Sequence, residues 1–322
     1  MDSLIDGVSN GFSAVQQWLF EAVVQPALFA LGLANFLEDA FLGTAWFLVG
    51  VIQILVLLAV FGPLQRWRPV EPVRDRATIR TDMLYTLIHR LGLFRIALFL
   101  TLEPVFDDLF GVLRTAGYGT FHLDQLWPGV TDGAVASFLI YLVAFDFLGY
   151  WIHRGQHRLD LWWRLHSLHH AQRQMTMWSD NRNHLLDDIL VDTLMVIAAQ
   201  LIGVAPGQFI AIVALTQLSE SLQHANVRLW FGQVGERLWV SPRFHRMHHS
   251  IGTGHEPAGK NTARGHNFGV LLPWWDVVFG TANFEQRYDP TGVRDQVEQS
   301  RDYGRGFWSQ QWLGLKRLLG RA

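Results

Sequence analysis

The 322-residue sequence predicts an all-α integral membrane protein with about four transmembrane helices, a helical hairpin and a cytoplasmic, histidine-rich helical domain. Two observations support this fold class. Half of the residues are apolar, yet the mean hydropathy of the whole chain is only slightly positive, so strongly apolar segments must alternate with polar ones. In addition, eight of the 14 histidines gather in three short segments between residues 153 and 249.

The composition excludes several classes of protein and site. The apolar content excludes intrinsic disorder. The chain has no cysteine, which excludes disulfides, thiolate zinc sites, iron–sulfur clusters and thiolate-ligated haem. A net charge of −2 gives no electrostatic reason to expect a nucleic-acid partner. The first ten residues, MDSLIDGVSN, contain no basic residue, so we do not expect a cleaved signal peptide.

The membrane-spanning elements are predicted from apolar runs. Residues 41–63 form an uncharged run that is long enough to cross a hydrocarbon core of about 30 Å. A further apolar region at 188–222 is split by Ala205-Pro206-Gly207, a turn signal that predicts a re-entrant or spanning helical hairpin. Three other stretches resemble spans that carry isolated polar residues, namely 14–36, 91–112 and 133–152.

The arginines predict the orientation in the membrane. The chain has 24 Arg and only 2 Lys, and the connection before the 41–63 span has no basic residue. The segment after that span carries six arginines: Arg66, Arg68, Arg74, Arg76, Arg80 and Arg90. The positive-inside rule therefore places residues 64–90 in the cytoplasm, and counting spans places everything after about residue 222 there too.

We expect three parts along the chain. Residues 1–132 are predicted to be a membrane anchor, residues 133–285 a histidine-rich domain, and residues 286–322 a polar tail. Within the tail, residues 306–320 have apolar residues at helical spacing beside two basic ones. This pattern predicts a helix that lies on the membrane surface or packs on the domain.

Eight histidines fall in three five-residue segments, HRGQH, HSLHH and HRMHH. Spacings of three and four residues place the side chains of each segment on one face of a helix. Convergent imidazoles on rigid elements are what a metal ion needs, and eight ligands are too many for one ion. We therefore predict two metal ions, bound by His153, His157, His166, His169, His170, His245, His248 and His249. Imidazole suits iron, zinc, copper and nickel, so a closed structural zinc site stays an alternative.

The order of these motifs resembles that of the fatty acid hydroxylase/sterol desaturase superfamily of integral-membrane di-iron enzymes. The resemblance covers residues 140–285, under half of the chain. Flanking segments match as well: Asp146, Tyr150 and His153-Arg154; Arg182-Asn183-His184, followed by Leu185 where proline is common; His224-Ala225-Asn226; Asn267-Phe268-Gly269; Trp275-Asp276; and Phe279-Gly280-Thr281.

Further site residues follow from the resemblance and from position. The resemblance makes His224 a metal ligand, and His184 a ligand, a neighbour of the ligands or a loop residue. Glu220 lies one helical turn before His224 and is expected to bind the metal or to orient His224. Asp146 lies inside a predicted span and is expected to accept the N–H of a metal-bound imidazole, with helix packing or pairing with Arg95 as the alternative.

The remaining candidates are weaker. Asn267 is expected to be a neighbour of the ligands or a ligand itself. His266 directly precedes this segment, and we do not expect it to touch the metals. His89, His122 and His255 are expected to be ordinary loop histidines.

The resemblance implies an oxygenase with two Fe ions, which zinc can replace in a purified sample. It would use O₂ and external electrons to hydroxylate a C–H bond of a fatty acyl, sterol, alkyl ether or isoprenoid lipid. A lipid desaturase or a sterol methyl oxidase at the same site is the first alternative. A metal transporter or metal-binding membrane protein is the second, although a transporter carries ionisable residues along several spans.

A separate electron donor is implied, because the chain has no cysteine for a cluster and no Gly-x-Gly-x-x-Gly segment for a nicotinamide or flavin. The donor would be a ferredoxin, a cytochrome or a reductase that docks on the cytoplasmic face. The arginines of residues 64–90 are a candidate docking site, and contact with anionic lipid headgroups explains them equally well. The expected membrane is the bacterial inner membrane, or the endoplasmic reticulum in a eukaryote.

Overall fold

The computed structural model describes residues 2–99, 101–251 and 265–321. Their regular secondary structure is helical, and no strand forms among them; one isolated bridge pairs Ser250 with Thr291. The all-α part of the predicted fold class is therefore confirmed.

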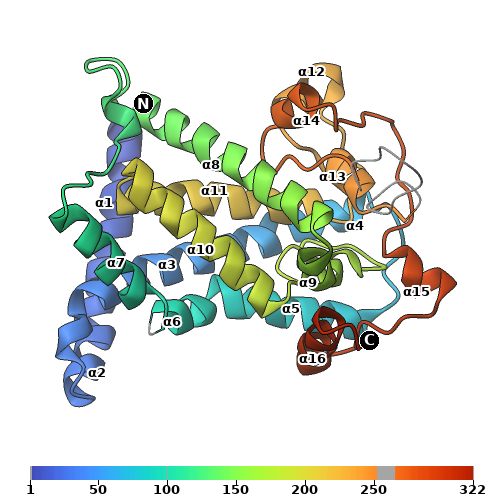
Figure 1. Cartoon of the computed structure of the whole chain (residues 1–322), viewed down its shortest axis with the longest axis horizontal. Coiled ribbons are helices and arrows are strands. Elements are labelled where there is room, and N and C mark those ends of the chain that lie inside the picture. Colours follow the sequence, from blue (N-terminus) through green and yellow to red (C-terminus); the bar gives the residue numbers. More distant parts are fainter. Residues whose placement is uncertain (1, 100, 252–264, 322) are drawn as a thin grey trace.

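A bundle of long helices forms the body of the molecule (Figure 1). α11 packs against both α3 and α8, and α5 runs beside α3. A hydrophobic core that includes Tyr141, Phe145, Ile212 and Leu271 joins α8 to α11 and to the segment that follows α13. The bundle helices are α3 (Leu37–Val56), continued by η3 (Leu57–Phe61) and α4 (Gly62–Trp67), α5 (Arg76–Arg90), α8 (Ala134–Arg158), α10 (Leu185–Ile202) and α11 (Pro206–His224).

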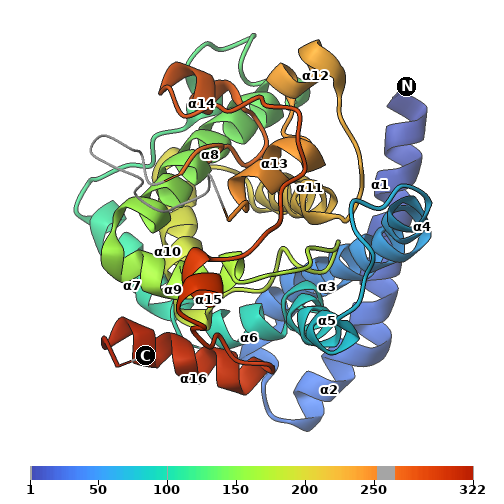
Figure 2. The same cartoon turned by 90° about the vertical axis from the view of Figure 1, so that its right-hand side faces the viewer.

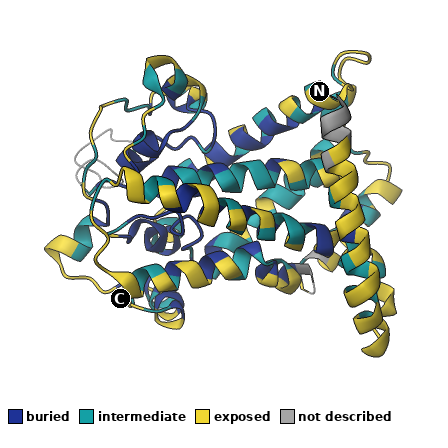
Figure 3. Ribbon diagram, turned by 180° about the vertical axis from the view of Figure 1, so that it is seen from behind, coloured by how far each residue is buried: buried dark blue, intermediate teal, exposed yellow. Residues whose placement is uncertain are grey.

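The N-terminal helix stands across one end of this bundle. α1 (Asp2–Leu19), η1 (Phe20–Val24) and α2 (Gln25–Ala30) follow one another without a break, and α1 packs on α3. In Figure 1 this helix is nearly perpendicular to the bundle, and in Figure 3 it is exposed along most of its length. Its exposed side chains include Val15, Trp18, Val23 and Phe29, apolar residues of the kind that face lipid.

Short helices gather at the opposite end of the bundle, on the right in Figure 1 and facing the viewer in Figure 2. They are α9 (Asp160–His170), α12 (Gly232–Leu238), α13 (Pro242–His248), α14 (Trp274–Val278), α15 (Arg294–Glu298) and α16 (Phe307–Leu318). α16 confirms the helix expected at residues 306–320. It packs against α9 and α5, while Trp308 and Trp312 on its outer side are 78% and 59% exposed. The division into three domains stays a prediction.

Two helical stretches are long and apolar enough to cross a membrane, Ala34–Trp67 and Ala134–Arg158. They contain most of the predicted spans 41–63 and 133–152. The predicted hairpin at 188–222 corresponds to α10 and α11, and Gly203 between them adopts a φ of 73° that favours glycine. The number of membrane-spanning helices stays a prediction.

The predicted span at 91–112 is wrong. Residues 93–115 form two short helices, α6 (Leu93–Phe99) and α7 (Glu103–Thr115), with a turn between them. Seven residues of α-helix extend only about 10 Å, so α6 alone is too short to cross a bilayer. Pro104 lies in the first turn of α7, where its missing N–H favours the start of a new helix over continuation of the old one.

Residues 64–90 are not a simple loop between spans, because α5 lies within them and belongs to the bundle. The side of the membrane that they face stays a prediction. Arg90 at the end of α5 is only 3% exposed, and its guanidinium pairs with Asp180 at 2.6 Å. The same group donates hydrogen bonds to the side chains of Gln53, Gln217 and Ser221. A buried arginine with this many partners is a structural link between α3, α5 and α11 rather than a charge in a loop.

The crossing of α3 and α5 requires a glycine. A Cβ at position 50 would overlap the backbone carbonyl of Arg90, whereas a Cβ at Gly43 on the same helix would meet nothing within 4 Å. α3 and α5 therefore approach each other through the bare backbone of Gly50.

We expect Gly50→Ala to destabilise the protein by about 1–3 kcal/mol, since the added methyl must push α5 away. Gly43→Ala is the matched control and should be neutral or slightly stabilising, because alanine favours a helix. The measurement is the thermal unfolding midpoint of each purified variant in detergent. Equal midpoints for the two variants would contradict the close approach of the helices.

Candidate metal centre

The three histidine motifs lie at helix ends that meet at one end of the bundle. His153 and His157 occupy the last turns of α8. α9, which packs against α8, carries the second motif, and α13, which packs against α11, carries the third. All eight motif histidines are buried.

Helix signals in the sequence fix the start of α13. Ser241 caps the helix by accepting a hydrogen bond from the backbone N–H of Phe244 at 3.1 Å, and Pro242 occupies the first turn. The Ser241 hydroxyl also donates to Glu236, which forms a buried ion pair with Arg243. This ion pair holds the N-terminal turn of α13 against α12.

The histidines form two groups of four, in each of which one nitrogen per residue lies within 4.8 Å of the others. The first group is His153, His157, His166 and His170; the second group is His169, His224, His245 and His249. A third set, His170, His248 and His249, joins the two groups. The structure thus brings together nine of the ten histidines predicted to be ligands.

The nitrogen spacings in the second group suit a metal ion. The Nε2 atoms of His169 and His224 are 3.1 Å apart, as are those of His224 and His245 and those of His245 and His249. Two nitrogens that each lie about 2.1 Å from one ion are about 3.0–3.4 Å apart when they are neighbouring ligands. Two facing nitrogens cannot both carry a proton at this distance, so at least one of each pair presents a lone pair.

Hydrogen bonds at Nδ1 set the tautomer of four histidines. His166 donates to Asp187 at 3.0 Å, and the other three donate to backbone carbonyls: His153 to Phe268 at 2.9 Å, His224 to Glu220 at 2.8 Å and His248 to His266 at 2.7 Å. An imidazole that donates through Nδ1 keeps a lone pair on Nε2. Among the described residues, the buried Nε2 atoms of His166 and His248 have no hydrogen-bond partner. The residues present therefore fit metal ions.

Burial favours the neutral form of four of these histidines. It lowers the pKa of His169, His245, His248 and His249 well below the ordinary value, and the positive charge of neighbouring protonated histidines would lower it further. Neutral imidazoles are the form that binds a metal ion.

The segment after residue 265 supplies two of the carbonyl acceptors, and Asn267 holds it in place. Asn267 adopts a φ of 60°, and its side chain bonds to the backbone of Phe244 and of Asn283. Its side-chain groups are thus used in positioning the segment. Asp276 accepts from the N–H groups of Phe268 and Gly269, at 2.8 and 2.7 Å, and fixes the same segment from the other side.

The expected role of Asp146 needs correction. Its carboxylate accepts from the backbone N–H groups of Leu271 and Leu272 at 2.7 and 3.2 Å, and from the indole of Trp275 at 2.8 Å. Within the part of the chain that the structure describes, it neither pairs with Arg95 nor accepts a hydrogen bond from an imidazole. Asp146 instead ties α8 to the segment that supplies the carbonyl acceptors.

Asp187 is the acceptor that the sequence interpretation missed. In addition to His166, it accepts from Gln156 at 2.8 Å and from the indole of Trp162 at 2.6 Å. It lies in the first turn of α10. The available signal was a carboxylate at the start of a largely apolar helix, a position where a buried acid needs donors.

The assignment of His184 as a metal ligand also needs correction. Its Nδ1 accepts from the backbone N–H of Leu186 at 3.1 Å, and its Nε2 contacts the carbonyl of Gln311 at 2.9 Å. Both ring nitrogens are therefore used, and His184 belongs to neither group. A Cβ at Gly314 would overlap the His184 ring, so this histidine fixes α16 against the bundle.

The other candidates are placed as follows. Glu220 orients His224 through its backbone carbonyl, and its side chain lines a cavity of about 270 Å³ that adjoins both groups. His266 contributes its carbonyl to His248. His89 lines the same cavity and faces Asp188, with His89 Nε2 and Asp188 Oδ2 3.4 Å apart, so it is not a loop residue. His255 lies outside the described residues.

Comparisons with known proteins confirm the resemblance. Residues 138–281 match the family model of the fatty acid hydroxylases. The chain is 27% identical over 310 residues to the ornithine lipid hydroxylase OlsE of Rhizobium tropici, which covers 93% of this chain and 87% of that protein.

Two further relatives are matched over a shorter segment. Identity is 26% over 161 residues to the very-long-chain aldehyde decarbonylase GL1-4 of Oryza sativa subsp. japonica, and 24% over 146 residues to the alkylglycerol monooxygenase of Caenorhabditis elegans. These matches cover 47% and 45% of this chain, but only 24% and 26% of the relatives. No solved structure matches the chain.

We expect Asp187→Asn to weaken metal binding by about 10–100-fold, because an amide cannot accept from Gln156, Trp162 and His166 all at once, and His166 then loses its fixed acceptor. Competition with a chelator, followed by elemental analysis, measures the metal retained by the purified protein. Asp108→Asn, on the exposed surface of α7, is the control. If both variants lose metal at the same chelator concentration, Asp187 does not support the site.

His184→Gln should keep the metal content of the wild type and lose about 1–3 kcal/mol of stability, because buried groups on α16 lose a partner. His169→Ala should instead lose metal. Elemental analysis and thermal unfolding of both variants test this difference. Loss of metal by His184→Gln, without unfolding, would restore it as a ligand.

Proposed function

We propose that this oxidoreductase, whose residues 138–281 form a fatty acid hydroxylase domain, is an integral-membrane di-iron oxygenase that hydroxylates a C–H bond of a lipid. The observation that carries the proposal is the pair of adjoining, buried histidine groups. The printed activities of the relatives, hydroxylation of an ornithine lipid and monooxygenation of an alkylglycerol, support a lipid substrate.

We assign one iron ion to each group. His153, His157, His166 and His170 would hold the first, and His169, His224, His245 and His249 the second, with His248 between them. Bound iron supplies the means to reduce O₂ and to oxidise an unactivated C–H bond. The nearly all-nitrogen donor set equally accepts zinc, so the metal found after purification depends on handling.

The reaction balances as R–H, O₂, two electrons and two protons giving R–OH and water. The electrons come from a separate donor, a ferredoxin, a cytochrome or a reductase. The chain's own residues hold the site ready: Asp187 and three backbone carbonyls keep the Nδ1 protons in place. Buried side chains around the histidines, including Leu168 and Phe268, exclude water.

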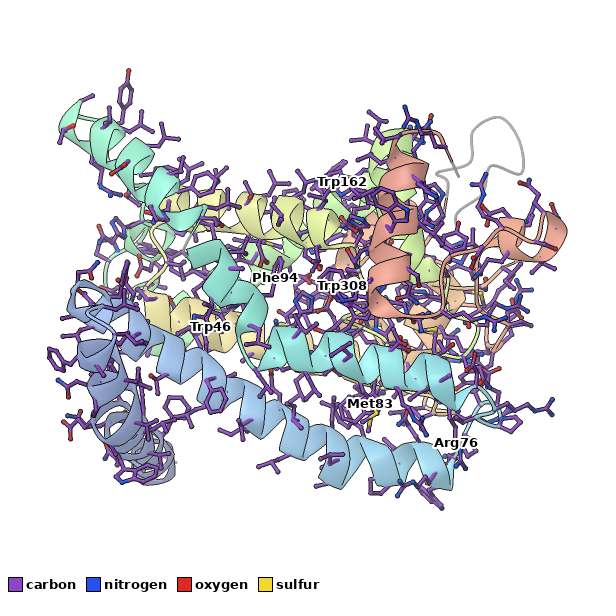
Figure 4. The ribbon with its side chains drawn as sticks, turned by 90° about the horizontal axis from the view of Figure 1, so that it is seen from below. Trp46, Arg76, Met83, Phe94, Trp162 and Trp308 are labelled. Carbon is purple, nitrogen blue, oxygen red and sulfur yellow. The ribbon has the colours of Figure 1, made fainter. Side chains whose placement is uncertain are left out.

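We propose that the histidine end of the bundle faces the cytoplasm. Five of the six arginines of residues 64–90 are exposed, namely Arg66, Arg68, Arg74, Arg76 and Arg80. Figure 4 shows Arg76 at the start of α5, at this end of the molecule. Exposed arginines next to an apolar span remain on the cytoplasmic side, where they can contact anionic headgroups or an acidic electron donor.

The purified protein should contain about two transition-metal ions per chain, and cells that express it should gain a lipid heavier by one oxygen atom. Elemental analysis and lipid mass spectrometry, with and without the gene, measure the two quantities. A lipid lighter by two hydrogens would indicate desaturation at the same site. Zinc alone, with no lipid product after anaerobic iron loading, would contradict the oxygenase.

His169→Ala and His248→Ala should each abolish the oxidised lipid while leaving membrane insertion intact, because each removes a ligand from the shared centre. His122→Ala is the matched control, since His122 is exposed and belongs to neither group. Product is measured by lipid mass spectrometry and insertion by the protein content of membranes. Wild-type product from either ligand variant would contradict the assignment.

A further inference from the structure

A second cavity, of about 250 Å³, lies beside α9 and is separate from the one that adjoins the histidine groups. Its walls come from α9, from α16 and from the segment between α15 and α16. α9 and α16 pack against each other at the end of the molecule that faces the viewer in Figure 2. Within the part of the chain that the structure describes, no histidine lines this cavity, but three arginines do: Arg164, Arg301 and Arg317.

Arg317 is buried with unused donors. It is only 3% exposed, and its Nε donates to the backbone carbonyl of Arg164 at 3.3 Å. Its Nη1 and Nη2 atoms are also buried and have no hydrogen-bond partner among the described residues. The guanidinium lies 4.3 Å from the centre of the Tyr303 ring, a contact that uses its face and none of its N–H groups. Buried donors without an acceptor are costly, so these N–H groups need a partner that the cavity can hold.

Arg164 reaches the same cavity from α9. Its Nη1 donates to the carbonyl of Leu318 at 3.0 Å, so Arg164 and Arg317 each bond the backbone of the other's helix. These two bonds hold α9 to α16, and they also bring two positive charges to one cavity. Like charges that are partly withdrawn from water repel each other, and an anion between them removes that cost.

The carboxylates nearby do not neutralise the cavity. Asp295 pairs with Arg301 at 3.1 Å, and both of its oxygens accept from the Tyr303 hydroxyl at 3.2 Å. Asp302 also acts on Arg317, but it is exposed, where water and salt screen its charge. Three arginines against these two carboxylates leave a surplus of positive charge.

The donors suit a phosphate group. A planar guanidinium forms paired hydrogen bonds with phosphate and carboxylate oxygens alike. A carboxylate offers two oxygens, whereas a phosphate monoester offers three and carries a charge of about −1.5 to −2 at pH 7. The arginines approach from three separate elements, and the buried hydroxyl of Ser167 lines the same cavity. Donors that converge from several directions, with surplus positive charge, favour the ligand that has more oxygens and more charge.

We propose that the pocket lined by Arg164, Arg301, Arg317 and Ser167 binds a phosphate group. The site goes beyond the proposed function, since none of these four residues belongs to the histidine groups and binding requires no iron. Two sources share this chemistry, inorganic phosphate and the headgroup of an anionic phospholipid. The lipid is a source because α16 carries two exposed tryptophans, a residue type that is typical of a membrane surface.

The pocket lies next to the metal centre without being part of it. The indole of Trp163 lines the pocket, and its ring centre is 5.0 Å from that of His157 and 5.3 Å from that of His170. One indole thus separates the phosphate from the first histidine group. A bound phosphate holds α16 against the helix that carries the second histidine motif, so we expect it to raise the thermal unfolding midpoint.

The test measures binding to the purified, full-length chain in an uncharged detergent, by isothermal titration calorimetry at constant ionic strength. The probes are inorganic phosphate, dihexanoyl phosphatidate and dihexanoyl phosphatidylcholine, of which the last carries no net charge. We expect phosphatidylcholine to bind at least about tenfold more weakly than the tighter of the two anions. Tighter binding of phosphatidate than of inorganic phosphate identifies a lipid headgroup as the source, and the reverse order identifies free phosphate. Absence of binding by both anions, or equally tight binding of phosphatidylcholine, would overturn the proposal.

Arg317→Gln should weaken binding of the anion by about tenfold or more, because the amide has no charge and cannot donate paired hydrogen bonds. Arg305→Gln is the matched control, since Arg305 is exposed, directly precedes the same helix and does not line the pocket. Thermal unfolding midpoints show that each variant is folded, and Arg301→Gln, at a side chain that is 39% exposed, repeats the test if Arg317→Gln is not. Wild-type affinity in a folded variant of either pocket arginine would overturn the proposal.

Phosphate also binds transition metals, so the metal centre needs its own control. His169→Ala, which we expect to lose metal, should keep the wild-type affinity for the anion. If folded His169→Ala no longer binds it, the anion belongs to the metal centre and the arginine pocket is overturned. If the iron-loaded protein oxidises no lipid but binds the anion through Arg317, the proposed function fails and the phosphate site stands.

Discussion

The structure depends on one electrostatic constraint, the packing of neutral imidazoles so that their nitrogen lone pairs face one another in a buried space. Three Nε2 pairs in the second group are 3.1 Å apart. Such lone pairs repel each other unless a cation lies between them. Bulk water does not reach these buried nitrogens to donate hydrogen bonds to them. Four of the rings, those of His153, His166, His224 and His248, are held from behind, through Nδ1–H, by a fixed acceptor.

The acceptors come from separate parts of the chain, so the constraint reaches well beyond the histidines. α10 contributes Asp187, α11 the carbonyl of Glu220, and the segment after residue 265 the carbonyls of His266 and Phe268. That segment is itself anchored by Asp146 and Asp276. Among the described residues, Asp146 and Asp276 form no hydrogen bond with a histidine ring themselves. They support the site through a second layer of hydrogen bonds, behind the carbonyl groups that accept from His153 and His248.

The sequence predicted the histidine groups because helical periodicity converts spacing directly into a shared face. The sequence did not predict the role of a residue whose partners are distant along the chain. His184 sits in a matching segment, but its ring packs against Gly314 of a distant helix. We grouped Arg90 with the basic residues that predict the orientation in the membrane, because its partner Asp180 is ninety residues away in the sequence. Asp187 was missed for the same reason, since its donors lie on α8 and α9.

The buried charges of the bundle have different surroundings. Arg90 lies where α3 and α5 meet through Gly50, and its ion pair joins elements that have to stay together. Asp192 and Glu220 instead line the cavity beside the histidines, where the positive charges that act on them are those of Arg95 and Arg90. Charges inside a helical bundle are costly unless they face a charge of opposite sign, so these two carboxylates also link α10 and α11 to the helices that carry the arginines.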